Sequence, residues 1–140
     1  MQSVNIPMNT IYTIGYSRLN FDNLIRAVEI EDLLLIDTRM SARSRVPQWN
    51  KGRLEKALGE RYVHIRELGN VNFKNPEAGM VLLDPETGIQ QAAQFLEKQS
   101  VLLLCGCFDV EHCHRKLVAE LLAEATGSPI IHWTGQDIGT

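Results

Sequence analysis

Short apolar runs alternate with stretches of helical periodicity along most of the chain. The apolar runs cover residues 11–14, 33–36, 62–65, 101–105 and 129–133, which are typical strand lengths. Apolar residues recur at helical spacing over residues 21–30, around residues 54–58, over residues 87–96 and after residue 109. This alternation predicts a three-layer α/β/α sandwich with a mostly parallel sheet of about five strands.

Capping residues support these predicted helices. Asn20, Asn50 and Asp109 each precede a helical stretch and are residue types that favour the N-cap position. Gly127 and Pro129 are expected to end the fourth helix. Residues 66–86 contain too many Gly, Asn and Pro residues for a regular pattern, so we predict a long loop, with a turn of helix or a short strand at residues 80–83.

Length and composition are those of one soluble domain. We expect a flexible tail over residues 1–9 and a single α/β domain over residues 10–140, with 44% hydrophobic and 22% charged residues. No signal peptide or membrane-spanning segment is apparent, so we expect a cytoplasmic protein with no membrane contact. The net charge of −3 argues against a chain that coats nucleic acid but permits a local basic patch.

Polar residues follow the predicted strands at their carboxyl ends. In an open parallel sheet these ends form the edge where ligands bind, so we expect the residues to converge there. They are Gly15 and Ser17, Asp37 and Arg39, His64, and Cys105 and Cys107.

The segment after the fourth strand is the densest in reactive side chains. His114 falls on the apolar face of the following helix, so we expect it to point inward, neutral and oriented by Asp37 or a backbone carbonyl. Cys113 and Arg115 flank it. A strand-to-helix turn also presents backbone N–H groups and the positive end of the helix dipole, which suit an anion.

Cysteine and basic residues add two further expectations. Cys105, Cys107 and Cys113 are clustered and odd in number, so we expect free thiols in a reducing compartment. A loop with no acidic residue carries four basic side chains that are able to attract phosphate, although a solvated loop also explains them. They are Arg43, Arg45, Lys51 and Arg53.

Several segments together resemble a bacterial family, domain of unknown function 488. They are Thr13-Ile-Gly-Tyr-Ser17, Asp37-Thr-Arg39, Pro47-Gln-Trp-Asn50, Tyr62-Val-His64 with Leu68-Gly69, Leu103-Leu-Cys105, and Cys113-His-Arg115. The resemblance covers about residues 11–133 and implies a small α/β domain whose site lies at these polar positions. It differs at two positions: the family usually has His in place of Tyr16 and commonly an acidic residue in place of Cys107.

Two kinds of site fit the spacing poorly. Rhodanese-like and phosphatase-like enzymes need a Cys and an Arg that bracket a five-residue loop, whereas seven residues lie between Cys107 and Arg115 and nine between Cys105 and Arg115. The C-x-C and H-x-H pairs here also differ from the usual spacing of structural zinc ligands. We therefore expect no metal and no cofactor.

The leading hypothesis is a domain that binds a phosphate-bearing ligand, either a nucleotide or a nucleic-acid end. Its predicted contacts are Gly15, Ser17, Arg39, Asn50, His64, Cys105 and Arg115, with nucleic acid held by the loop from Arg43 to Arg53. The enzyme alternative is a hydrolase or transferase that uses Cys113 or an Asp37 and His114 pair. A regulatory or interaction domain without catalysis is the second alternative. The sequence leaves the oligomeric state open.

Overall fold

A computed structural model of the chain describes residues 8–106 and 110–139, and these residues contain one parallel sheet of five strands. The strands are β1 (Ile11–Gly15), β2 (Leu34–Asp37), β3 (Tyr62–His64), β4 (Val101–Cys105) and β5 (Ile130–His132), in the order β3-β2-β4-β1-β5. The predicted α/β architecture is therefore confirmed. Expectations that involve residues 1–7 and 107–109 lie outside the described part.

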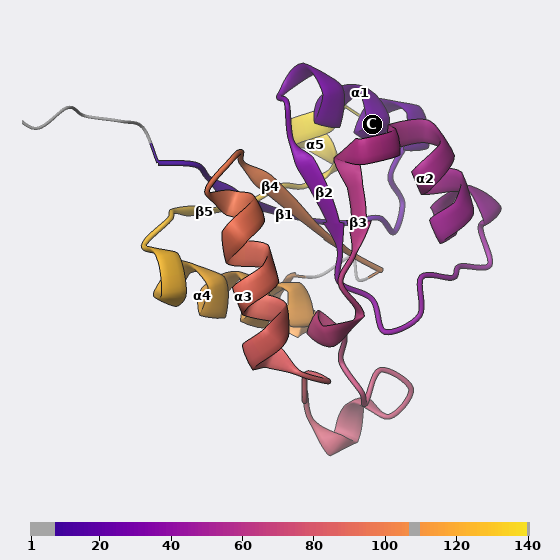
Figure 1. The fold of residues 1–140 in the computed structure, drawn as a ribbon. Helices are drawn as coiled ribbons and strands as arrows, with labels where there is room; N and C mark the ends of the chain where they lie inside the picture. The colour runs from indigo at the N-terminus through magenta and orange to yellow at the C-terminus, as the bar shows by residue number, and fades with distance from the viewer. Residues whose placement is uncertain (1–7, 107–109, 140) are drawn as a thin grey trace, which may run out of the picture.

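Helices cover both faces of this sheet (Figure 1). The helices α1 (Phe21–Ile30) and α2 (Lys51–Leu58) pack on one face, and α3 (Pro85–Leu96) and α4 (His114–Thr126) pack on the other. A fifth short helix, α5 (Gly135–Ile138), lies beside α1 and was not predicted. Thr134 and Asp137 start it with a reciprocal capping box.

Strand β4 shows why the apolar runs are continuous. Leu102 and Leu104 face the core beneath α1 and α2, while Val101 and Leu103 face the core beneath α3 and α4. Successive side chains of a strand point to opposite faces, so a strand covered on both sides needs an apolar residue at every position. All five residues of β4 are buried.

Two predicted helix starts are correct or nearly so. Asn20 caps α1, since its side chain accepts a hydrogen bond from the backbone N–H of Asn23 at 3.0 Å. Asp84 caps α3 in the same way through Thr87, and Pro85 occupies the first turn. Pro at this position loses no helical hydrogen bond, so α3 starts two residues before the predicted residue 87.

The second predicted helix starts where the sequence places it, directly after Asn50, but without the expected capping bond, and the start of the fourth helix is corrected. Asn50 precedes α2, but its side chain caps nothing there and instead accepts a hydrogen bond from the backbone N–H of Ser44 at 2.5 Å. The fourth helix starts at His114, because Cys113 is extended and separates α4 from a 3-10 turn at Val110–His112. The predicted cap Asp109 lies outside the described residues.

The region after β3 is largely the loop that the sequence predicts. It contains 3-10 turns at Arg66–Leu68 and Pro76–Ala78 and an isolated antiparallel bridge between Asn70 and Leu82. Backbone hydrogen bonds from Leu83 to Gly69 and from Asp84 to Glu67 hold its two ends together. No helix in the described part is long and apolar enough to cross a bilayer.

The topology creates two crevices at one edge of the sheet. The chain leaves β4 toward the face covered by α4, whereas it leaves the two neighbouring strands, β2 and β1, toward the face covered by α2 and α1. Adjacent parallel strands whose exits diverge leave a crevice at their carboxyl ends. One crevice therefore lies on each side of the end of β4.

Candidate functional site

The register of the sheet brings the predicted polar residues to one edge. Gly15 pairs with Cys105, and Asp37 pairs with Leu104 on one side and with His64 on the other. These positions are the last residues of their strands or adjoin them, so the turns that follow them lie at the same edge of the sheet.

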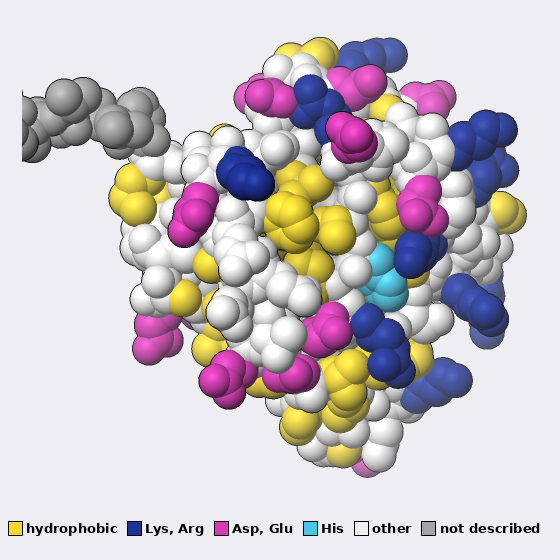
Figure 2. Space-filling view, in the orientation of Figure 1, with side chains coloured by type: hydrophobic (Ala, Val, Ile, Leu, Met, Phe, Trp, Pro, Cys, Tyr) yellow, Lys and Arg dark blue, Asp and Glu magenta, His cyan; other side chains and the backbone are white. Residues whose placement is uncertain are grey.

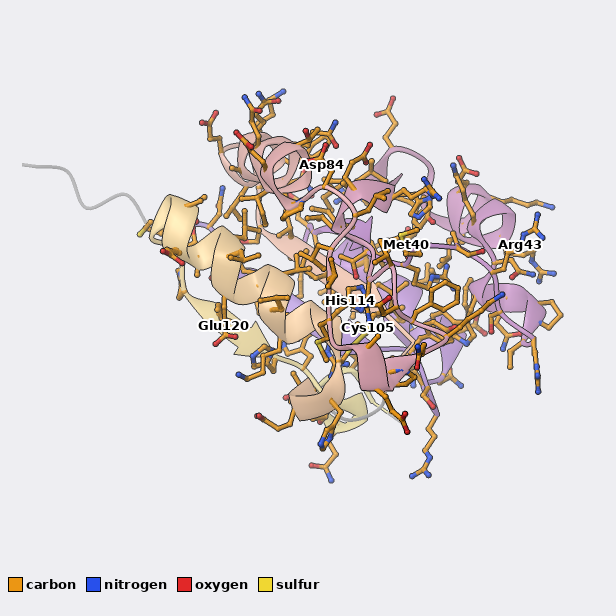
Figure 3. All side chains as sticks on the ribbon, turned by 90° about the horizontal axis from the view of Figure 1, so that it is seen from below. Met40, Arg43, Asp84, Cys105, His114 and Glu120 are labelled. Carbon is orange, nitrogen blue, oxygen red and sulfur yellow. A yellow bond between two sulfur atoms is a disulfide. The ribbon has the colours of Figure 1, made fainter. Side chains whose placement is uncertain are left out.

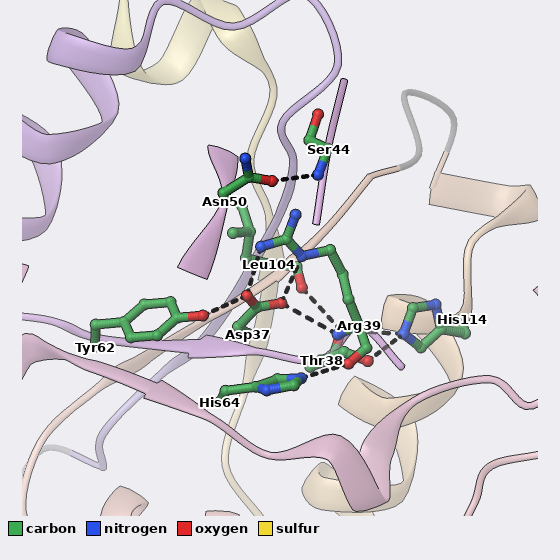
Figure 4. A network of polar contacts seen from close by, with 9 residues as sticks. All are labelled: Asp37, Thr38, Arg39, Ser44, Asn50, Tyr62, His64, Leu104 and His114. Carbon is green, nitrogen blue, oxygen red and sulfur yellow. Dashed lines mark hydrogen bonds and ion pairs between the residues drawn. The ribbon is translucent and has the colours of Figure 1, made fainter. Parts of the chain in front are cut away.

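Asp37 is the centre of a buried hydrogen-bond network (Figure 4). Its carboxylate accepts hydrogen bonds from Nε of Arg39 at 2.8 Å, from Nη2 of Arg39 at 2.7 Å and from the Tyr62 hydroxyl at 2.6 Å. The side chain of Asp37 is fully buried, and that of Arg39 is 7% exposed. Buried charges need this degree of pairing to remain ionised.

The same network shifts the titration of both partners of Asp37. Burial lowers the pKa of Arg39, but the hydrogen bonds and negative charge of Asp37 outweigh it and hold that pKa above its ordinary value. Burial and the charge of Asp37 both raise the pKa of the Tyr62 hydroxyl. Arg39 is thus a permanent cation, and Tyr62 is a permanent hydrogen-bond donor.

His114 points inward, as the sequence predicts, and Thr38 orients it. The Thr38 hydroxyl donates to the Leu104 carbonyl at 2.9 Å, so it can only accept from Nε2 of His114 at 3.1 Å. Nε2 also lies 2.8 Å from the Thr38 carbonyl, which is an obligatory acceptor. The proton of the neutral ring therefore lies on Nε2, and Nδ1 carries the lone pair.

The environment of His114 favours this neutral form. Burial lowers the pKa of His114 and outweighs the hydrogen bond to Thr38, and the charge of Arg115 lowers it further. Among the described residues no hydrogen bond joins Asp37 to His114. The sequence suggests either Asp37 or a backbone carbonyl as the group that orients His114, and the structure shows that it is the carbonyl of Thr38.

Two further predicted contact residues hold the backbone around the site. Nε2 of His64 donates to the Arg39 carbonyl at 2.6 Å, which fixes the chain where it leaves β2. The hydrogen bond from the backbone N–H of Ser44 to the side chain of Asn50 fixes the loop from Arg43 to Arg53, the basic loop, in the same manner. Both side chains act on the shape of the site, and neither lines its cavities.

The expectation of free thiols is wrong for Cys105 and Cys113, whose sulfur atoms are joined in a disulfide. Figure 3 shows Cys105 beside His114 at the start of α4. Cys105, Cys113 and His114 also carry atoms of the kind that bind metal ions, and these atoms lie within 4.8 Å of one another. The guanidinium of Arg115 lies 3.5 Å from the Cys105 sulfur, and its positive charge disfavours a cation there.

Arg115 is the second residue of α4, and its side chain is buried against β1. Its Nε donates to the Thr13 hydroxyl at 3.3 Å, and Thr13 is 2.6 Å from Nδ1 of His132 on β5. Burial lowers the pKa of His132, and the charges of Arg115 and Lys116 lower it further. Arg115 thus links β1, β4 and α4.

Four of the seven predicted contact residues line one of two cavities, and the other three, Asn50, His64 and Cys105, line neither. One, of about 850 Å³, lies at the ends of β1 and β5 and is lined by Gly15, Ser17, Arg115 and residues of β5 and α5. The other, of about 730 Å³, lies between the exits of β2 and β4 and is lined by Arg39 and His114. Ser17 and Arg115 therefore do not share a cavity with Arg39, because Tyr16 and the end of β4 stand between them.

The second cavity, which we call the basic cavity, collects positive groups. None of the described residues that line it is acidic, whereas five are basic or carry an imidazole: Arg39, Arg43, Lys74, His112 and His114. Its remaining walls include Tyr16, Met40, Phe73 and Gly106. Such a lining attracts anions even in a chain whose net charge is −3.

Sequence reasoning missed several residues of the site. Thr13 and Tyr62 stand in the segments that resemble the family, but they were given no role of their own, because β-branched and aromatic side chains are ordinary in strands. Thr38 was noticed only as a neighbour of Asp37, and Lys74 belongs to a loop without a regular pattern. A polar Thr within the apolar run of β1 was the one available signal.

Comparison with known proteins identifies the family. The model of Domain of unknown function DUF488 matches residues 21–122, and the chain belongs to this family. No curated protein and no solved structure matches the chain significantly.

Proposed function

We propose that this DUF488 domain binds a phosphate-bearing ligand, a nucleotide or the end of a nucleic acid, in the basic cavity. The observation that carries the proposal is the lining of this cavity, where Arg39, Arg43 and Lys74 meet two imidazoles and no described acidic residue. Asp37 offsets the charge of Arg39, so the excess positive charge comes from Arg43 and Lys74. A phosphate group would neutralise it.

An unsatisfied donor supports the same ligand chemistry. Nη1 of Arg39 is buried and has no hydrogen-bond partner among the described residues. A buried charged donor without a partner costs roughly 1–3 kcal/mol or more. An oxygen atom of a bound anion at the Arg39 wall would supply the missing acceptor and offset this cost.

The neighbouring basic loop supports the nucleic-acid form of this ligand. Arg43, Arg45, Lys51 and Arg53 are all exposed. Figure 2 shows Lys and Arg side chains gathered along the edge of the molecule where α2 and this loop lie. A nucleic-acid strand whose terminal phosphate enters the basic cavity would continue across this surface.

The experiment measures thermal stabilisation of the full chain by ATP, by inorganic phosphate and by short oligonucleotides with and without a 5′-phosphate. A ligand at a hundred times its dissociation constant adds about 2.7 kcal/mol to the free energy of unfolding. The stabilisation should shrink as salt is raised, because phosphate contacts release counterions. An oligonucleotide effect that needs the 5′-phosphate would identify a nucleic-acid end.

Matched variants locate the binding site. Arg43→Gln and Lys74→Gln should each weaken binding about five- to tenfold at low salt, which corresponds to loss of one phosphate contact. Arg26→Gln, on the exposed surface of α1 away from the basic cavity, should leave binding unchanged. Absence of stabilisation by all of these phosphates at low salt, or equal losses in the three variants, would refute the proposal.

No observation favours the enzymatic alternative, a hydrolase or transferase, in either of its two versions. Cys113 is joined to Cys105 and is only 1% exposed, so it does not present a free nucleophile to either cavity. The carboxylate of Asp37 is occupied by Arg39 and Tyr62 rather than by His114. The proposal is therefore limited to binding.

A further inference from the structure

We infer that Cys105 and Cys113 form a reversible dithiol–disulfide site that reacts with hydrogen peroxide or small organic hydroperoxides. The inference concerns the junction of β4 and α4 and does not depend on the phosphate-bearing ligand. It rests on three observations: two sulfur atoms placed together by the fold, a guanidinium at one of them, and a helix start at the other.

The fold itself brings the two sulfur atoms together. Cys105 is the last residue of β4, which is hydrogen-bonded to β1 and β2 on its two sides. Cys113 is the N-cap residue of α4, which packs against β1 and β4. Each cysteine therefore belongs to an element that is anchored in the sheet or packed against it.

The surroundings stabilise a thiolate in the reduced pair. Nη1 of Arg115 donates toward the Cys105 sulfur at 3.5 Å. Cys113 stands at the start of α4, a helix of 13 residues, where the helix dipole is positive. A neighbouring cation and a helix N-terminus both favour the thiolate, which is the reactive form of cysteine.

The reaction with hydrogen peroxide balances within this pair. The Cys105 thiolate attacks one peroxide oxygen, the O–O bond breaks, and hydroxide leaves to take up a proton as water, which produces a sulfenic acid. The Cys113 sulfur then attacks the sulfenic sulfur, the S–S bond forms, the S–O bond breaks, and a second water leaves with the Cys113 proton. Two thiols are oxidised, and one peroxide is reduced to two waters.

Because both cysteines are buried, we expect only small oxidants to reach their sulfur atoms. Cys105 is 0% exposed and Cys113 is 1% exposed, so bulky disulfide reagents cannot approach either sulfur in the folded chain. Gly106, directly after Cys105, lines the basic cavity, so the end of β4 adjoins a space that a small molecule can enter. We therefore expect fast reaction with peroxide and slow reaction with an aromatic disulfide reagent.

The experiment uses the full chain with Cys107→Ser, which removes the third thiol of the sequence. The protein is reduced with dithiothreitol, exposed to hydrogen peroxide while folded, alkylated with iodoacetamide, and digested with trypsin and a protease that cuts after Glu. Cleavage at Glu111 separates the two cysteines, so a disulfide alone can hold residues 99–111 and 112–115 together. Mass spectrometry detects the linked fragments.

The expected result is formation of the linked fragments in the folded chain at least about tenfold faster than in urea, and their loss after renewed reduction. Arg115→Gln should slow the reaction. Cys113→Ser should stop it at a sulfenic acid on Cys105 that dimedone traps, a readout that does not require the Arg115 variant to fold.

Three outcomes would overturn the inference. The first is that both thiols of the folded chain remain open to iodoacetamide after peroxide treatment. The second is oxidation of one cysteine beyond sulfenic acid with no linked fragments. The third is a linkage that forms no faster in the folded chain than in urea.

Discussion

A single carboxylate determines much of the geometry around the basic cavity. Asp37 fixes the guanidinium of Arg39 through two of its donors and receives the hydroxyl of Tyr62 from the neighbouring strand. Long side chains normally lose binding energy to conformational entropy when a ligand orders them. Arg39 is already ordered in the absence of a ligand, so binding of an anion would not require this loss of conformational entropy.

Asp37→Asn should be strongly destabilising, because it leaves the buried cation of Arg39 without its counter-ion. Removing one partner of a buried ion pair costs about 3–5 kcal/mol. Tyr62→Phe is the matched control, since it removes one hydrogen bond to the same carboxylate and should cost roughly 1.5–3 kcal/mol. Urea unfolding measures both values, and a smaller loss in Asp37→Asn than in Tyr62→Phe would contradict this account.

The buried imidazole of His114 should make the folded chain less stable in weak acid. Its pKa is lowered in the folded chain, so as the pH falls below about 6.5 the unfolded chain takes up the proton first and the free energy of unfolding decreases. The contribution is fully present above that pH and disappears toward the lower folded pKa. His132, whose pKa is lowered as well, adds to the effect.

The measurement compares urea unfolding at about pH 7 and about pH 5. His114→Gln should show a smaller decrease than the parent chain, because part of the proton linkage has been removed. Gln90→Ala, which changes an exposed residue of α3 that does not titrate, should keep the full decrease. Equal decreases in the parent and His114→Gln would show that the buried imidazole does not control the acid response.

At the scale of elements, Gly69 allows the long loop to pack under the turn after β2. A Cβ atom at Gly69 would lie 2.6 Å from Cα and 2.7 Å from the backbone N of Met40, a residue that lines the basic cavity. Backbone atoms cannot move aside as a flexible side chain can. The contact between these two segments therefore requires glycine.

Gly69→Ala should destabilise the chain by roughly 1–3 kcal/mol, the usual cost of an added methyl group in a close-packed site. Gly52→Ala, in α2 with no atom within 4 Å of the new Cβ, is the control and should be neutral or stabilising by up to about 1 kcal/mol. Thermal unfolding distinguishes them. Equal effects of the two substitutions would mean that the Gly69 contact is unimportant.

Element boundaries also show what the sequence can predict. The apolar runs located all five strands. The central strands β2 and β4, which are buried on both faces, stay apolar until their ends, and Thr13 is the one polar exception in β1. The start of α4 was misplaced, since an Asp before an apolar pattern resembles a cap whether or not a 3-10 turn intervenes. Helix caps depend on one local hydrogen bond, which composition alone does not reveal.

The candidate site was predictable only in part for a related reason. Polar residues at strand ends were identified because they interrupt apolar runs, and the structure brings Arg39 and His114 to one cavity. Which residues share a cavity depends on strand order. Because β4 lies between β1 and β2, Ser17 and Arg115 are separated from Arg39.

For the whole molecule, the same strand order predicts the behaviour of a truncated chain. A fragment ending at residue 100 keeps the pairing of β2 with β3 but lacks both neighbours of β1. We expect it to show no cooperative urea unfolding by circular dichroism, in contrast to the full chain. A sharp transition in the fragment would mean that the first hundred residues form a core of their own.

The position of β4 also has a consequence for how the protein is made. Ile11 in β1 pairs with Val101 in β4, so the first strand leaves the ribosome long before the segment that completes its pairing is synthesised. Distant pairings of this kind slow folding, because the entropy of closing a long loop must be overcome before any contact forms. During synthesis the apolar strands of the first half remain uncovered, which makes the nascent chain a natural client for chaperones.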